Sequence, residues 1–168
     1  IAEELGQYDA QFYKLAEKLL QQLATAAPQE KLRVATLLGK HGETDEIIKA
    51  LRMCTQADQQ VIPVEKSAAV AINILRQHPK DWKGSLSGAI GELNQWFERI
   101  ASVNSDSTVV QWRTAEYFDM LGDLDRAEAK YQAVLNAESF KNPTERGMVM
   151  NNLAYAMALN GKSDEPLA

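Results

Sequence analysis

The 168-residue chain contains few of the residues that carry catalysis or bind metals. It has one cysteine, Cys54, so it cannot form an internal disulfide bond. Its two histidines, His41 and His78, are too few to build a structural zinc site with that cysteine, and both lie at predicted helix ends, where an imidazole suits the helix dipole. Neither belongs to a pattern that pairs a nucleophile with a base. We therefore expect no enzymatic activity, no metal and no cofactor.

The sequence also lacks a long hydrophobic run and an excess of positive charge. Its most apolar segment, residues 68–72, ends at Asn73, whereas a membrane-spanning helix needs about 18 consecutive apolar residues. Lysine and arginine total 18 against 23 aspartates and glutamates, which gives a net charge of −5. Proteins that bind the nucleic-acid backbone gather positive charge instead. We expect neither a membrane-spanning segment nor a nucleic-acid partner.

Helical periodicity, in contrast, runs through most of the chain. Prolines fall between the periodic segments, at positions 28, 63, 79 and 143, where a missing N–H does little harm. Asn142 is placed to cap a helix that starts at Pro143. The pattern predicts short helices joined by turns and no strand. The clearest apolar stripes are Leu5, Tyr8, Phe12, Leu15, Leu19 and Leu23; Leu86, Ile90, Leu93, Phe97 and Ile100; and Leu124, Ala127, Tyr131, Val134 and Leu135.

Four turns share the pattern Gly-x-x-Asp, at residues 6–9, 42–45, 122–125 and 161–164. Their spacing is consistent with a period of roughly 40 residues if one degenerate turn lies near residues 77–81, and such a period is typical of a solenoid. We expect each glycine to end a helix in the left-handed conformation. Each aspartate should then lie in the first turn of the next helix, where its charge favours the dipole.

Two further expectations concern small residues inside helical patterns. Gly84, Gly88 and Gly91 each cost about 1 kcal/mol relative to alanine if they are helical. Either the helix begins after Gly84, or a neighbouring helix packs closely against it, and we expect close packing at Gly88 and Gly91. Cys54 lies on the apolar face of its helix, so we expect a buried and unreactive thiol.

Small and aromatic residues alternate around the turn at Gly122, between Trp112 and Leu135. This arrangement resembles the tetratricopeptide repeat family, and residues 152–161 resemble the first helix of another repeat. A third unit, from Pro28 to Cys54, has the same register. The matching positions are Ala115, Phe118, Gly122, Asp125, Ala127, Tyr131 and Leu135 in the first unit, and Val34, Ala35, Leu38, Gly42, Asp45, Ile47 and Leu51 in the third.

The resemblance implies an all-α fold, an α-solenoid of antiparallel helical hairpins wound as a right-handed superhelix. We expect one repeat array over residues 1–168, with units near 1–27 (partial), 28–62, 63–104, 105–142 and 143–168 (partial). The partial units lead us to expect a piece excised from a longer protein. They also lead us to expect self-association through the unfinished repeat ends.

In the resembling family the first helices line a concave groove, so the resemblance implies a scaffold that binds an extended peptide or a partner helix. Arg33, Arg113 and Asn152 take the same position in different repeats. Because guanidinium groups suit carboxylates, we expect an acidic peptide or a free C-terminus as partner. Positions that hold lysine in chaperone-tail-binding members are Gln29, Val109 and Met148 here. The expected peptide-binding residues are Arg33, Thr36, Trp112, Arg113, Glu116, Asn151, Asn152 and Tyr155, with Asn73 and Arg76 as candidates in the middle unit.

Two other functions stay open on the sequence alone. One is an RNA-binding helical-repeat module, against which the acidic pI of about 5.1 and the lack of a one-base-per-repeat pattern both argue. The other is a non-catalytic accessory region of a larger enzyme. A third alternative concerns the site itself: the two arginines can simply pair with Glu30 and Glu116 and bind no ligand.

Overall fold

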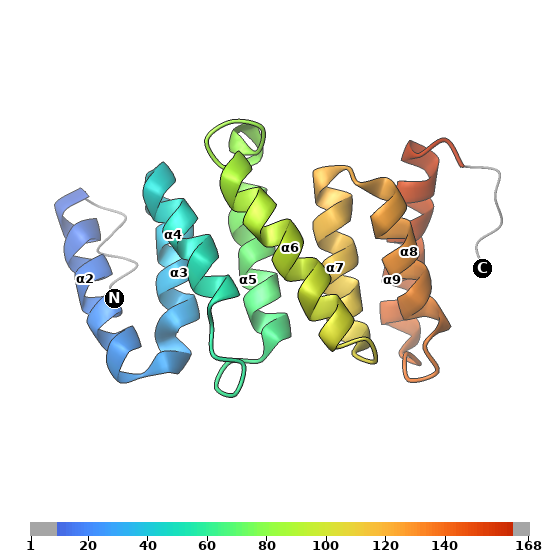
Figure 1. The fold of residues 1–168 in the computed structure, drawn as a ribbon, viewed down its shortest axis with the longest axis horizontal. Coiled ribbons are helices and arrows are strands. Elements are labelled where there is room, and N and C mark those ends of the chain that lie inside the picture. The colour runs from blue at the N-terminus through green and yellow to red at the C-terminus, as the bar shows by residue number, and fades with distance from the viewer. Residues whose placement is uncertain (1–9, 163–168) are drawn as a thin grey trace. The chain divides into compact units, whose positions relative to one another are not determined.

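The computed structural model describes residues 10–162, and all regular elements in that range are helical (Figure 1). The all-α prediction is therefore confirmed for these residues, and no helix among them is both long enough and apolar enough to cross a membrane. The turn at residues 6–9 and the aspartate of the 161–164 turn lie outside the described residues. The elements are α2 (Ala10–Ala26), η1 (Pro28–Glu30, 3₁₀), α3 (Lys31–His41), α4 (Thr44–Thr55), α5 (Val64–Gln77), η2 (Pro79–Asp81, 3₁₀), α6 (Ser87–Val103), α7 (Thr108–Leu121), α8 (Leu124–Asn136) and α9 (Pro143–Leu159).

The chain divides into two compact units, residues 1–96 and 97–168, and the division falls inside α6. In unit 1, α3 packs against α2, α4 and α5, and α4 also packs against α5. In unit 2, α8 packs against both α7 and α9. Each of these helices thus packs against a helix close to it in sequence, over connections of a few residues.

The core of unit 1 is built on α3, whose Val34, Leu38 and Gly39 are buried. A Cβ atom on Gly39 would lie 2.5 Å from Cγ1 of Ile74, so only a glycine lets α3 approach α5 this closely. His78, which follows α5, donates from Nε2 to the Gly39 carbonyl oxygen over 2.6 Å. The predicted helix-end position of His78 is confirmed, and its ring links the ends of the two helices.

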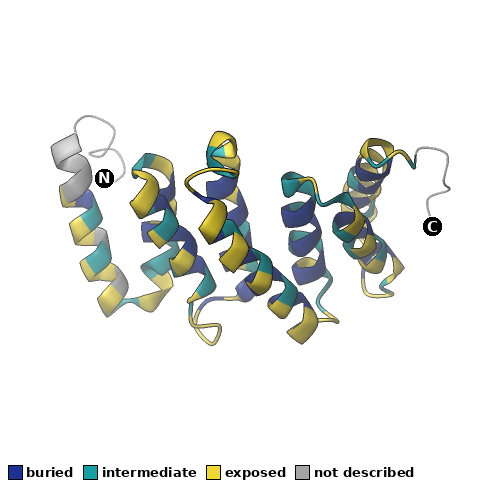
Figure 2. Ribbon diagram, turned by 45° about the horizontal axis from the view of Figure 1, so that its top comes forward, coloured by how far each residue is buried: buried dark blue, intermediate teal, exposed yellow. Residues whose placement is uncertain are grey.

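The core of unit 2 is aromatic. The Phe97 and Tyr117 rings stack with their centroids 4.0 Å apart, and Phe118 meets Tyr117 edge-on at 5.3 Å. The buried faces of α7 and α8 are dark blue in Figure 2. The five residues that we expected in this core are all buried: Ala115, Phe118, Ala127, Tyr131 and Leu135.

Two of the predicted left-handed glycines are confirmed and one is wrong. Gly122 ends α7 with φ 77°, and Gly161 follows α9 with φ 73°. Gly42 has φ −78° and ψ 159°, because the chain leaves α3 in an extended conformation and enters α4 through a capping box of Glu43 and Glu46. A side chain is excluded at Gly42 for a different reason, since its Cβ would lie 2.4 Å from the backbone oxygen of Leu38.

The expected close packing at Gly88 and Gly91 is wrong. Both glycines are exposed on α6, and apart from the adjoining residues and backbone of α6 itself, no described heavy atom lies within 4 Å of the place that a Cβ atom would take. The helix begins at Ser87, after Gly84, which is the other alternative that the sequence left open. In the described structure, no contact with a neighbouring helix therefore compensates for the low helix propensity of these glycines.

The stripe at the start of the chain behaves differently from the other two stripes. Its helix is confirmed over residues 10–26, but Leu15, Leu19 and Leu23 on α2 are exposed, while Ala16 is buried. The amphipathic pattern therefore predicts the helix correctly, although these three leucines are 41–50% exposed.

Candidate functional site

The expected peptide-binding residues fall in both units. Arg33 and Thr36 lie on α3 in unit 1, and the other six lie on α7 and α9 in unit 2. The alignment of Arg33 with Arg113 and Asn152 along one face therefore stays a prediction.

Both α3 residues are exposed and have partners three or four residues earlier in the chain. Arg33 Nη1 lies 2.8 Å from Oε2 of Glu30, and the Thr36 hydroxyl donates to the Leu32 carbonyl oxygen over 2.8 Å. An exposed ion pair of this kind contributes only about 0–1 kcal/mol. A ligand carboxylate could therefore replace Glu30 at little cost.

In unit 2, side chains from α7 and α9 meet at the hydroxyl of Tyr131 on α8. This hydroxyl donates to Oδ2 of Asp119 over 3.1 Å, and the Asn152 side chain also hydrogen-bonds to Tyr131. Arg113 Nη1 lies 2.6 Å from Oε2 of Glu116 on the same helix. Burial raises the pKa of Tyr131, and the negative charges of Asp119 and Glu116 raise it further. The phenol therefore stays protonated and can hold α7 and α9 side chains at one point.

Trp112 anchors the neighbouring part of α7. Its ring meets Phe140 edge-on with centroids 6.0 Å apart, and the guanidinium carbon of Arg113 lies 5.7 Å from the Trp112 ring centroid. Arg146 fixes the segment that carries Phe140 by donating from Nη1 to the carbonyl oxygens of Leu135 and Phe140, over 2.8 and 3.2 Å. The Trp112 Nε1 atom is buried and has no hydrogen-bond partner among the described residues.

An exposed apolar stripe follows α9 beside this polar cluster. Met148, Asn152, Tyr155 and Leu159 are three or four residues apart, so they share one face of the helix. Tyr155 is 61% exposed, Met148 53% and Leu159 58%. Asn151 is exposed next to them, and Val109 is exposed on α7.

The structure thus brings together Arg113, Glu116 and Asn152 around the Tyr131 hydroxyl, which the sequence alone does not place in the site. Asp119 lies three residues after Glu116 on α7, so helical spacing could have placed it on the same face. Tyr131 was predicted only as a core residue. Neither its hydroxyl contacts nor the role of Phe140 follows from any local pattern.

Cys54 in unit 1 is buried, as predicted. Burial raises the pKa of its thiol from the ordinary value of 9.0 to about 12, against a small opposing effect of the Lys31 charge. The thiol is therefore protonated at neutral pH, and it is a poor nucleophile and metal ligand. Over residues 10–162, no cluster of three or more His, Cys, Asp or Glu side chains is arranged to hold a metal ion.

Comparison with protein-family models, with curated proteins and with solved structures finds no match for this chain. The resemblance to tetratricopeptide repeats therefore rests on the residue pattern described above.

Proposed function

We propose that this chain is a non-catalytic protein-interaction module, in which α7 and α9 bind an extended peptide or a helix of a partner protein. We propose further that its helices form antiparallel hairpins of a tetratricopeptide-like solenoid, with α3, α5, α7 and α9 as the first helices. Exposed surfaces of such first helices suit an extended ligand.

The observation that carries this proposal is the exposed stripe of Met148, Tyr155 and Leu159 on α9. Large apolar side chains that gather on one surface mark interaction sites, and aromatic residues and methionine are enriched in interfaces. Asn152 lies within the stripe, where its amide can bind a peptide backbone. Arg113, which is about one-third exposed, adds a cation beside it.

The arginines alone suggest an acidic peptide, but the surface of α7 and α9 fits a more apolar partner. Val109 and Met148 offer apolar contacts where lysines would offer charge. Arg113 already faces Glu116, so a ligand carboxylate has to compete for its guanidinium group. We therefore propose a segment in which apolar side chains supply most of the affinity and one acidic group orients it.

The test is a selection of peptides from a displayed library against the wild-type protein, followed by affinity measurements on variants. We expect a Met148→Ala/Tyr155→Ala double variant to bind the selected peptides at least about tenfold more weakly, the loss typical of interface hot spots. Met150→Ala is the matched control, because Met150 is exposed on the opposite side of α9 from Met148. Equal affinity for the wild type and the double variant, or no enriched peptide, would contradict the proposal.

The non-catalytic part of the proposal has its own test. We expect the protein not to hydrolyse simple ester, phosphate or peptide substrates above the buffer rate. Turnover by the wild type that disappears in a His41→Ala or His78→Ala variant would show that a histidine acts as a base.

A further inference from the structure

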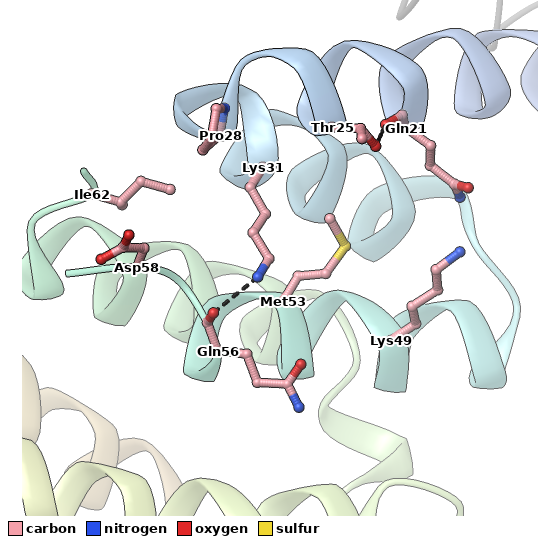
Figure 3. Close-up of a pocket in the computed structure, with 9 residues that line it drawn as sticks. All are labelled: Gln21, Thr25, Pro28, Lys31, Lys49, Met53, Gln56, Asp58 and Ile62. Carbon is pink, nitrogen blue, oxygen red and sulfur yellow. Dashed lines mark hydrogen bonds between the residues drawn. The ribbon is translucent and has the colours of Figure 1, made fainter. Parts of the chain in front are cut away.

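A separate cleft lies in unit 1, between α2 and α4 (Figure 3). Its volume is about 460 Å³, within the range typical of ligand sites. The start of α3 and the loop after α4 complete its walls. Lys31, on α3, is about 200° around the helix axis from Arg33, so the cleft is on another side of α3 from the expected peptide-binding residues.

Two lysines reach the cleft from different helices. Lys31 Nζ donates to the Gln56 carbonyl oxygen at the end of α4 over 2.9 Å, which uses one of its three N–H donors. Lys49 Nζ lies 3.6 Å from Oε1 of Glu17, a loose pair whose lysine side chain is half exposed. In Figure 3 the Met53 side chain lies between the two ammonium groups. Both lysines therefore retain donors on either side of an apolar surface.

Each of the two nearby carboxylates accepts a hydrogen bond from its own chain. Oδ1 of Asp58 accepts a hydrogen bond from the backbone N–H of Gln60 over 2.9 Å, inside the loop after α4. Glu17 accepts one from the Gln21 side chain. Lys31 and Lys49 are the cations that line the cleft, and they lie above a floor to which Met53 and the buried Ile62 contribute.

A second hollow of about 570 Å³ continues along α4 and shares Lys49, Met53 and Gln56 with the first. Arg52 lies in it and binds Glu92 of α6 through two hydrogen bonds, of 3.0 and 2.6 Å. A ligand that follows both hollows is extended rather than compact. The side-chain amides of Gln21 and Gln56 offer donors and acceptors of the kind that a peptide backbone uses.

We propose that this cleft binds a short peptide segment of a partner protein, with an apolar side chain against Met53 and Ile62 and a carboxylate that pairs with Lys31 or with Lys49, on one side of Met53. The carboxylate belongs to an acidic side chain of that segment. The site shares no residue with the α7 and α9 surface, so it stands or falls independently of the function proposed above.

The test is a titration of the ¹⁵N-labelled full chain with three synthetic peptides, followed by amide resonances. The first is acetyl-Ala-Leu-Glu-Leu-Ala-amide, the second replaces its glutamate with glutamine, and the third is acetyl-Ala-Ala-Ala-Leu-Ala with a free carboxyl end. We expect saturable shifts at Met53 and Gln56 with the first peptide, whereas shifts with the third peptide alone would contradict an acidic side chain as the ligand. We expect binding about tenfold weaker for the glutamine peptide, which corresponds to the loss of one charge-assisted contact.

Lysine variants distinguish binding in the cleft from a general effect of the protein's charge. Lys31→Gln/Lys49→Gln should weaken binding of the acidic peptide about tenfold, and Lys49→Gln alone, at a half-exposed position, should weaken it without affecting the fold. Lys40→Gln is the control, because Lys40 is exposed on α3 outside the cleft. The proposal is overturned by equal affinities for the glutamate and glutamine peptides, by unchanged binding in both lysine variants, by shifts confined to α7 and α9, or by no saturable shift with any peptide.

Discussion

Tyr131 combines two roles in one side chain, since its ring lies in the core of unit 2 and its hydroxyl binds Asp119 and Asn152. We expect Tyr131→Ala to lower the free energy of unfolding by about 3–5 kcal/mol, the range for deleting a buried aromatic ring. Tyr131→Phe keeps the ring and removes only the hydrogen bonds, so we expect a loss of about 1 kcal/mol. Urea unfolding of both variants checks this; equal losses would show that the ring does not carry the stability.

Cys54 provides a pH-dependent contribution to stability. Its folded pKa of about 12 lies above its ordinary value of 9.0. Below pH 9 the thiol is neutral in both states, and its contribution is fully present. Above pH 9 the unfolded chain loses the proton first, so the contribution falls as pH rises toward 12, by about 1 kcal/mol at pH 10.

The measurement compares wild type with Cys54→Ala by urea unfolding at pH 7.5 and pH 10, because other groups titrate equally in both proteins. We expect the stability difference between them to narrow at pH 10. A constant difference would mean that the folded thiol ionises as readily as the unfolded one.

At the scale of the helices, Gly39 and Gly91 make a matched pair. Gly39 is buried where α3 meets α5, and an added methyl group would collide with Ile74, so Gly39→Ala should destabilise by about 1–3 kcal/mol. Gly91 lies inside α6 with no neighbour within 4 Å in the described structure. Gly91→Ala should therefore stabilise by about 0.5–1 kcal/mol. Thermal unfolding shows whether each variant is less or more stable than the wild type. Destabilisation by both substitutions would refute the environments assigned to the two glycines.

The helices themselves were largely predictable, because their ends carry local signals. Asn142 accepts hydrogen bonds from the N–H groups of Thr144 and Glu145 as the capping pattern predicts, and Gly122 adopts the expected positive φ. The close approach at Gly39 was not predictable, because it depends on Ile74 on another helix. At Gly88 and Gly91 the expected close packing was wrong, because a glycine in a helical pattern does not indicate whether a neighbouring helix packs against it.

The candidate site likewise contains one contact that the sequence predicts and others that it does not. The pairing of Arg113 with Glu116 follows from helical spacing and is one of the alternatives that the sequence leaves open. The meeting of Asp119 and Asn152 at the Tyr131 hydroxyl joins three helices, so no local pattern contains it. The cleft beside α4 was missed for the same reason, since its two lysines come from different helices and neither belongs to a motif.

At the scale of the whole molecule, α6 is the element that both units share. Leu93 on one side of the division and Phe97 on the other are buried, and Gln95 between them is exposed. Helix formation is cooperative along a continuous backbone, so we expect the wild type to unfold in one calorimetric transition. Gln95→Pro removes a helical hydrogen bond and costs about 3 kcal/mol or more, so it should separate two transitions.

The control for this prediction is Gln95→Ala, which keeps the helix and should keep the single transition. Two resolved transitions already in the wild type would show that α6 does not couple the units.

The contact of Trp112 with Phe140 and Arg113 gives the protein an optical reporter at one of its two candidate surfaces. A peptide that binds along α7 and α9 and draws Arg113 away changes the electric field at the indole, and we expect the fluorescence emission to shift. The nine side chains that line the cleft in Figure 3 include no tryptophan. In a Trp82→Phe/Trp96→Phe variant the tryptophan fluorescence would come from Trp112 alone. We expect a ligand that binds in the cleft of Lys31 and Lys49 to leave the emission wavelength of that variant unchanged.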